Sequence, residues 1–147
     1  LFPGAATVMK RELVLIPVVG WAMARAGNIA VERGDGAKAL RGLVKQAKAT
    51  LAEGRSILIF PEGTRVAVGA EKPYQVGTAA LYRQLGVPVV PVAHNAGRLW
   101  GRNAFSKHPG LITMSIGKPI ETKGRKAEEI NAEVEAWIEN EIQQLPH

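Results

Sequence analysis

Short apolar runs alternate with segments of helical periodicity along this chain. Residues 56–60 and 89–93 form two mainly apolar runs, each of the length expected for a strand that is covered on both faces. Residues 40–51 and 76–85 instead place their apolar side chains at helical spacing. Strands that alternate with helices are typical of an α/β domain. We therefore predict an α/β fold with a mostly parallel sheet flanked by helices.

Shorter patterns predict the remaining elements. Further strands are expected at residues 6–9, 29–31 and 112–116. A helix is expected after Pro17 and ends before Gly27, and a last helix is expected from about Ala127 with its apolar residues on one side. Because no repeat or linker interrupts this series, we predict a single domain over residues 1–147.

The composition excludes some kinds of site and favours an anionic partner. The 147 residues include no cysteine, which rules out a disulfide framework and a thiolate metal site. The net charge is +6, but residues 127–147 hold six of the 13 acidic residues and no Lys or Arg. Residues 1–126 therefore carry 19 basic and 7 acidic residues, a balance of +12. This charge favours phosphate, an acidic carrier or anionic lipid, and because no nucleic-acid-binding motif accompanies it we predict no nucleic-acid partner.

No stretch of the sequence is apolar for long enough to predict a membrane span. Residues 13–24 are interrupted by Pro17 and Gly20 and are shorter than the ~20 residues that a spanning helix needs. The irregular region at residues 95–110 alternates basic and aromatic side chains. These side chains are Arg98, Trp100, Arg102, Phe105 and Lys107. We interpret this region as a surface-binding loop, in which Trp100 and Phe105 are candidates for contact with a membrane interface.

A cluster of polar residues directly follows the first apolar run. In open α/β sheets, ligands bind beyond the carboxyl ends of strands, and this cluster occupies such a position. Pro61 ends the hydrogen-bond ladder of the predicted strand, because proline has no N–H to donate. Gly63 permits a tight turn, and Arg65 has the forked donor geometry that suits phosphate. Thr64 supplies a short donor, and Glu62 has the reach either to orient Arg65 or to hold a neighbouring backbone group. On the residues alone, the alternative is a turn closed by a surface ion pair, whereas no glycine-rich nucleotide motif is present.

Residues 60–65, Phe-Pro-Glu-Gly-Thr-Arg, match in full a motif of the glycerolipid acyltransferases, the family of the 1-acyl-glycerol-3-phosphate (lysophosphatidic acid) acyltransferases. Four further segments resemble motifs of this family, in the family's order. They are Lys10-Arg11-Glu12-Leu13 with Pro17 and Gly20-Trp21, Gly27 with Ile29 and Arg33, Tyr74 with Gly77 and Ala80, and Val87-Pro88-Val89-Val90-Pro91-Val92. The chain therefore resembles a member of this family that lacks its N-terminal part, and the α/β fold agrees with this resemblance.

The resemblance implies an O-acyltransferase of phospholipid biosynthesis. An acyl group would pass from acyl-CoA or acyl carrier protein to the free hydroxyl of lysophosphatidic acid, giving phosphatidic acid, without a cofactor and without a metal. The resemblance associates binding of the acceptor's phosphate with Arg33, Glu62, Gly63, Thr64 and Arg65. It also implies a membrane-associated protein, which works on a lysophospholipid at the cytoplasmic face of the membrane.

The family's His-x-x-x-x-Asp motif, whose histidine deprotonates the hydroxyl, is not in this sequence. The only aspartate is Asp35, and Ala30 stands five residues before it. We therefore expect the catalytic pair upstream of Leu1, and we expect the 147-residue chain by itself to be inactive. His94 follows the predicted strand at residues 89–93, and we interpret it as a hydrogen-bonded loop residue rather than as a replacement base.

Two alternatives stay open. The acceptor could be another lyso-lipid or glycerol-3-phosphate, because the shape of the pocket decides the acceptor. The isolated chain could also be a non-catalytic module that binds phosphate or lipid through Arg33 and Arg65, since such binding needs no base. A His-x-x-x-x-Asp motif upstream of Leu1 would favour the enzyme over the module.

Overall fold

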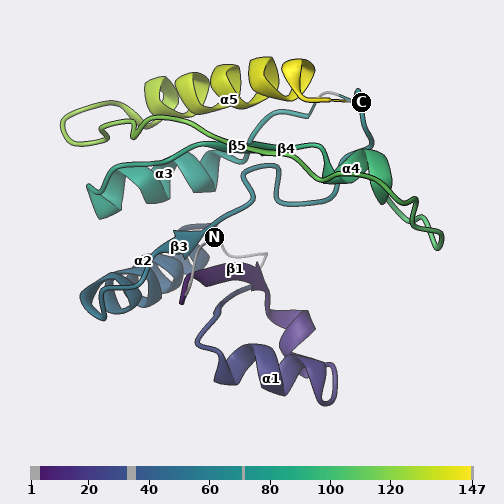
Figure 1. Cartoon of the computed structure of the whole chain (residues 1–147). Coiled ribbons are helices and arrows are strands. Elements are labelled where there is room, and N and C mark those ends of the chain that lie inside the picture. Colours follow the sequence, from purple (N-terminus) through teal and green to yellow (C-terminus); the bar gives the residue numbers. More distant parts are fainter. Residues whose placement is uncertain (1–3, 33–35, 71, 147) are drawn as a thin grey trace. The chain divides into compact units, whose positions relative to one another are not determined.

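The computed structural model describes residues 4–32, 36–70 and 72–146, and Figure 1 shows the whole chain. Its elements in chain order are β1 (Ala6–Lys10), the 3-10 helix η1 (Arg11–Leu15), α1 (Val19–Arg25), β2 (Ile29–Val31), α2 (Gly36–Ala52), β3 (Ile57–Leu58), α3 (Val76–Leu85), β4 (Val92–His94), α4 (Ala96–Leu99), β5 (Met114–Ile116) and α5 (Ala127–Gln144). Two compact units divide the chain, Leu1–Phe60 and Pro61–His147. The single domain expected over the whole chain stays a prediction.

The first unit is a three-stranded parallel sheet with helices packed against it (Figure 1). The strand order is β2-β1-β3, and both outer strands run parallel to β1. Helix α2 packs against β2 and β3 and buries Leu43 and Ala47, as its periodicity predicts. This arrangement confirms the α/β class with a parallel sheet. Because the strands are parallel, their carboxyl ends lie at the same edge of the sheet.

A glycine allows α1 to pack closely on η1. A β-carbon built on Gly20 would lie within 3.0 Å of the backbone carbonyl oxygens of Leu13 and Val14. Real β-carbons essentially never approach a backbone oxygen so closely, and neither oxygen belongs to a flexible side chain. The close approach explains why a glycine precedes Trp21 in this segment.

The replacement Gly20→Ala is expected to lower the free energy of unfolding by about 1–3 kcal/mol, because the added methyl group overpacks this contact. Gly42→Ala is the matched control, since a β-carbon there meets nothing within 4 Å. This exposed position in α2 should instead gain about 0.5–1 kcal/mol from the alanine. Urea denaturation followed by far-UV circular dichroism measures both changes. Equal effects at the two positions would contradict the close-packing argument.

Arg55 joins three segments of the first unit. Its Nε donates to the carbonyl oxygen of Gly4 at 2.7 Å, and its Nη2 donates to that of Ala26, just after α1, at 3.0 Å. Gly27 has a φ of +71°, and a β-carbon there would clash with the Arg55 guanidinium. Arg55 therefore caps the carboxyl end of α1, a role that sequence reasoning missed because the residue follows Gly54 in an ordinary helix-to-strand connection.

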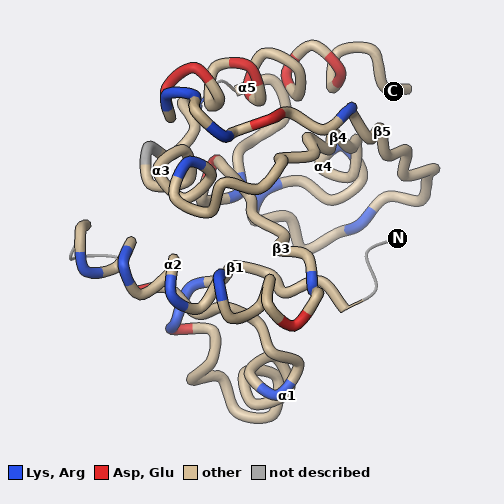
Figure 2. The backbone as a smooth tube through the Cα atoms, turned by 90° about the vertical axis from the view of Figure 1, so that its left-hand side faces the viewer, with Lys and Arg blue, Asp and Glu red and all other residues tan. Residues whose placement is uncertain are grey.

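The second unit is built on the antiparallel pair β4–β5, with α5 packed against it and α3 packed against α5 (Figure 1). The register pairs Ala93 with Ser115. Ala93 is buried, and Ser115 Oγ donates to Glu141 Oε1 of α5 at 2.6 Å. The core of this unit contains Leu81 of α3 and Ile130 of α5, each with at most 1% of its surface exposed. Figure 2 shows acidic residues along α5, and Ile130, Val134 and Ile138 of this helix are buried, which confirms the predicted last helix with its apolar residues on one side.

The apolar run at residues 56–60 forms a much shorter strand than predicted. Only Ile57 and Leu58 pair with β1, and their side chains are half-buried. Phe60, which the run predicted to be buried, is 55% exposed. The prediction of a strand covered on both faces along this whole run is therefore wrong.

The strand predicted at residues 89–93 is displaced toward the C-terminus. Val89 makes an isolated bridge to Ile120, and the strand β4 itself begins after Pro91. Proline has no N–H to donate to a ladder, so it stands before the strand rather than within it. β4 includes His94, which pairs with Met114, and the interpretation of His94 as a loop residue is therefore wrong.

Candidate functional site

The candidate site is the turn at residues 61–65, at the beginning of the second unit. The backbone N–H of Gln75, the residue before α3, donates to the carbonyl oxygen of Pro61 at 2.8 Å. Its side-chain Nε2 donates to the carbonyl oxygen of Glu62 at 3.5 Å. Gly63 has a φ of +66°, in the left-handed region that glycine adopts without a steric cost. The turn is therefore held to the start of α3 and needs the glycine at its centre.

Arg65 connects this turn to the loop at residues 100–107. Its Nη2 donates to the carbonyl oxygens of Trp100, at 2.9 Å, and Gly101, at 3.2 Å. Its guanidinium carbon lies 4.8 Å from the centroid of the Trp100 ring, a cation–π distance. Nη2 donates both hydrogen bonds, and within the described part of the chain neither Nη1 nor Nε of Arg65 donates one. The stacked guanidinium is thus oriented by two carbonyls and an indole ring, with donors left for an anion.

Glu62 lies near three other ionisable side chains, those of Lys72, Tyr74 and Glu139. Burial raises the pKa of the Glu62 carboxyl above its ordinary value, the Glu139 carboxylate raises it further, and Lys72 offsets part of the rise. The Tyr74 hydroxyl donates to Glu139 Oε1 at 3.2 Å, and burial with this carboxylate raises the pKa of Tyr74. Among the described residues, no ion pair or hydrogen bond joins Glu62 to Arg65. Of the two roles left open for Glu62, orientation of Arg65 is therefore not found among these residues, because the loop at residues 100–107 orients that arginine instead.

The structure brings four of the five predicted substrate-binding residues together in this turn, Glu62, Gly63, Thr64 and Arg65. The fifth, Arg33, lies outside the described residues. Its neighbourhood in sequence is the carboxyl end of β2, where an open hollow of about 900 Å³ in the first unit is lined in part by Arg11, Glu32 and Lys38. Arg11 and Glu32 form an ion pair there.

His94 has an ordinary local partner. Its Nδ1 accepts a hydrogen bond from the backbone N–H of Ala96 at 3.3 Å. A general base needs a group that orients it, and no carboxylate is hydrogen-bonded to His94 among the residues that the structure describes. The hydrogen bond expected at His94 is therefore present, and the expectation that His94 is not a replacement base stays a prediction.

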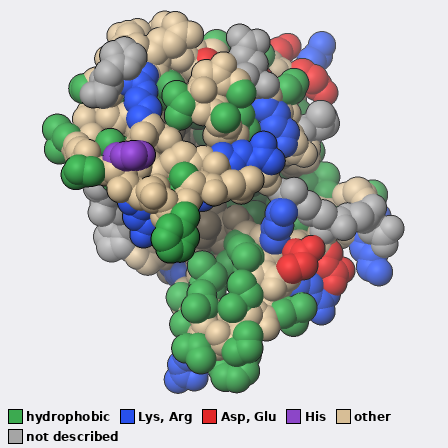
Figure 3. Space-filling view, turned by 90° about the vertical axis from the view of Figure 1, so that its right-hand side faces the viewer, with side chains coloured by type: hydrophobic (Ala, Val, Ile, Leu, Met, Phe, Trp, Pro, Cys, Tyr) green, Lys and Arg blue, Asp and Glu red, His purple; other side chains and the backbone are tan. Residues whose placement is uncertain are grey.

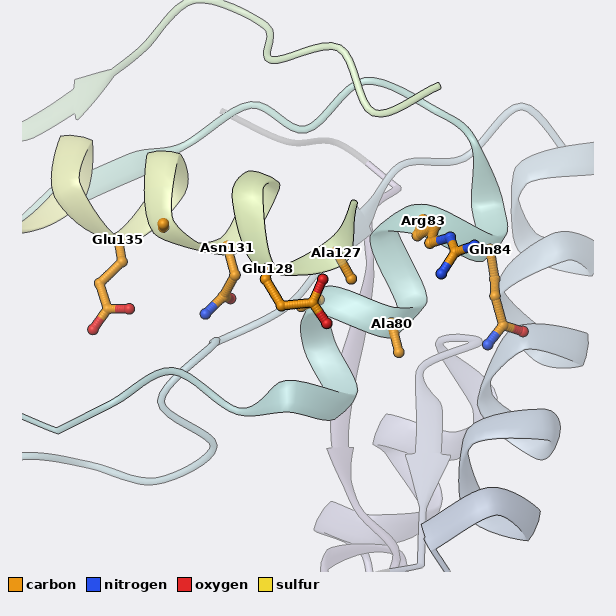
Figure 4. A pocket seen from close by; sticks show the side chains of 9 residues that line it. Ala80, Arg83, Gln84, Ala127, Glu128, Asn131 and Glu135 are labelled. Carbon is orange, nitrogen blue, oxygen red and sulfur yellow. The ribbon is translucent and has the colours of Figure 1, made fainter. Parts of the chain in front are cut away.

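An open groove of about 700 Å³ lies between α3 and α5 (Figure 4). The side chains of Arg83, Gln84, Glu128, Asn131 and Glu135 line it together with several alanines. Asn131 Oδ1 is buried without a hydrogen-bond partner among the described residues. None of the predicted substrate-binding residues lines the groove, so we do not assign the candidate site to it.

The family model that describes acyltransferases matches residues 3–95, which is more than half of the chain. The chain belongs to the acyltransferase family. The matched region of this acyltransferase chain includes the whole turn at residues 61–65 and ends just before α4. Sequence reasoning found this membership from the Phe-Pro-Glu-Gly-Thr-Arg motif, and the comparison confirms it.

Individual acyltransferases are similar over nearly the whole chain. The 1-acyl-sn-glycerol-3-phosphate acyltransferase of Pseudomonas aeruginosa is 39% identical over 147 residues, which cover 98% of this chain and 57% of that protein. The enzyme of the same name from Cocos nucifera is 29% identical over 144 residues, covering 97% of this chain and 47% of that protein. The chain spans about half the length of these curated relatives.

A solved structure confirms the fold of this acyltransferase chain. The crystal structure of the 1-acyl-sn-glycerophosphate (LPA) acyltransferase, PlsC, from Thermotoga maritima matches with a TM-score of 0.75 and 26% sequence identity. The match covers 96% of this chain and 56% of the other. The α/β fold class predicted from alternating strands and helices is therefore confirmed.

Proposed function

We propose that the whole protein transfers an acyl group to the free hydroxyl of 1-acyl-glycerol-3-phosphate and so makes phosphatidic acid in phospholipid biosynthesis. In this reaction the hydroxyl oxygen attacks the carbonyl carbon of a thioester, an ester bond forms, and the carbon–sulfur bond breaks. The thiolate leaves and takes up the proton that the hydroxyl gives to a base. The donor class is a thioester of coenzyme A or of acyl carrier protein.

The oriented guanidinium of Arg65 is the observation that carries this proposal. A phosphate group carries the charge and the lone pairs that a forked guanidinium donor recognises. Two backbone carbonyls and the Trp100 ring already hold the side chain, so little side-chain entropy is lost when the anion binds. By resemblance to the family, Glu62, Gly63, Thr64 and Arg33 are also assigned to binding of the acceptor's phosphate, and we propose that this binding needs neither a metal nor a cofactor.

By resemblance to the family, we assign the role of base to the histidine of a His-x-x-x-x-Asp motif. Residues 1–147 do not contain this motif. We also propose that the protein acts at the cytoplasmic face of a membrane, because its acceptor and product are lipids. Within the described residues, no helix combines the length and the apolar character needed to cross a bilayer. A basic surface would attract both anionic lipid headgroups and an acidic carrier protein.

The full-length protein tests the proposal directly. It is incubated with lysophosphatidic acid and either acyl-CoA or acyl carrier protein thioester, and phosphatidic acid is quantified by mass spectrometry. Formation of phosphatidic acid with either donor is the expected result. Acylation of glycerol-3-phosphate or of another lyso-lipid, without phosphatidic acid, would contradict the proposed acceptor. Absence of acyl transfer to every acceptor would contradict the proposed activity.

A further inference from the structure

The loop at residues 100–107 presents aromatic and basic side chains on the surface of the second unit. We call Trp100, Arg102, Phe105 and Lys107 the loop surface. Phe105 is fully exposed, and Trp100 is 45% exposed. We propose that the loop surface docks on a lipid membrane that carries anionic headgroups. The inference deepens the membrane-surface part of the proposed function by naming the residues that make the contact.

The loop has a defined shape rather than a loose chain. Trp100 Nε1 donates to the carbonyl oxygen of Ala104 at 3.0 Å. The backbone N–H of His108 donates to the carbonyl oxygen of Leu99 at 2.8 Å. Arg65 holds the loop from the candidate site through the two carbonyl bonds described above. Because the indole N–H is already satisfied, the ring can enter the headgroup region without leaving an unpaired donor.

The charge around the loop suits an anionic surface. Residues 72–120 contain six Lys and Arg residues and no Asp or Glu. Of the loop cations, Lys107 has its Nζ 4.4 Å from the centroid of the Trp100 ring, and Arg102 is exposed. Figure 3 shows the face that lies on the right-hand side of Figure 1, where hydrophobic, basic and histidine side chains of the second unit are interspersed. Exposed aromatics beside basic side chains are typical of contact with anionic lipid headgroups.

Arg98, a fifth basic or aromatic residue of this region, has a different role. Its Nη1 donates to the carbonyl oxygens of Pro146, at 2.8 Å, and Leu145, at 3.1 Å. It therefore caps the carboxyl end of α5, where a cation also interacts favourably with the helix dipole. We accordingly leave Arg98 out of the loop surface.

Apolar side chains continue the exposed surface beyond the loop. Leu111 and Ile112 are exposed. Met114 and Ile116 lie on the face of β5 opposite to Ser115, whose side chain is hydrogen-bonded to α5, and they are exposed too. A soluble protein gains nothing by exposing such a run to water. A bilayer interface can accept these side chains while its headgroups pair with the neighbouring cations.

Co-sedimentation of the 147-residue chain with lipid vesicles tests the inference without an acyl donor or acceptor, so its outcome is independent of acyl transfer. Vesicles of phosphatidylcholine with phosphatidylglycerol should bind the chain more tightly than vesicles of phosphatidylcholine alone, and salt should weaken the binding. Phe105→Ser should weaken it about tenfold. The double replacement Arg102→Gln with Lys107→Gln should weaken it about 25-fold, at about fivefold for each basic residue.

A matched control for the basic residues lies in the first unit. Arg41→Gln with Lys45→Gln removes two exposed basic residues of α2. This variant should bind as the wild type does. Equal binding to neutral and anionic vesicles, or loss of binding with this control but not with Arg102→Gln and Lys107→Gln, would overturn the inference. The inference would also be overturned if the loop joined two copies of the chain. In that case Phe105→Ser would dissociate a dimer and leave vesicle binding unchanged.

Discussion

The replacement Arg65→Ala in the full-length protein is expected to raise the KM for lysophosphatidic acid about 10- to 100-fold. Hydrogen bonds to a charged group contribute about 1.5–3 kcal/mol, and each 1.4 kcal/mol corresponds to a tenfold change in affinity. The KM for the acyl donor should change little, because the proposed contact is with the acceptor's phosphate. Steady-state kinetics with one substrate varied at a time measures both constants.

Monoacylglycerol, an acceptor without a phosphate, separates phosphate binding from a structural role of Arg65. Arg65 also holds the loop at residues 100–107, so its loss could disturb the site without any phosphate contact. If Arg65 binds the phosphate, the variant loses kcat/KM on lysophosphatidic acid but keeps it on monoacylglycerol. A similar loss on both acceptors would reject the phosphate assignment. Arg41→Ala, an exposed arginine of α2, is the matched control and should leave both values unchanged.

The replacement Ile130→Ala is expected to lower the free energy of unfolding by about 2–5 kcal/mol. Ile130 lies on the face of α5 that packs in the second unit, and none of its surface is exposed. Truncation removes the transfer free energy of the buried methyl and methylene groups and leaves a cavity whose walls relax only in part. Urea denaturation followed by far-UV circular dichroism measures the change.

Ile112→Ala is the control for this prediction, because it removes the same atoms from a side chain that is 57% exposed. Exposed substitutions away from special features usually change stability by no more than about 0.5 kcal/mol. A loss at Ile130 no larger than the loss at Ile112 would show that α5 does not contribute a stable core to the second unit.

Local patterns in the sequence predicted much of the fold. Helix α3 has the predicted bounds, and Gly86 ends it in the left-handed conformation, as glycine does after many helices. The strands β1 and β2 and the helix α5 were also predicted, since the periodicity and the capping of each depend only on residues a few positions apart. The prediction of strand length failed at residues 56–60, where β3 ends at Leu58 although β1 continues to Lys10, because strand pairing depends on tertiary context and not on the apolar run itself.

The sequence alone established the candidate turn. The motif of this turn named the family, and the positive φ of Gly63 agrees with the tight turn that a glycine there predicted. The side chains and carbonyl groups that surround the turn were decided by the tertiary structure. Arg65 and Trp100 are 35 positions apart, and Tyr74 and Glu139 are 65 apart. The partners of a long polar side chain are chosen by the packing of distant segments, which leaves no periodic signal in the sequence, whereas a turn needs only its own residues.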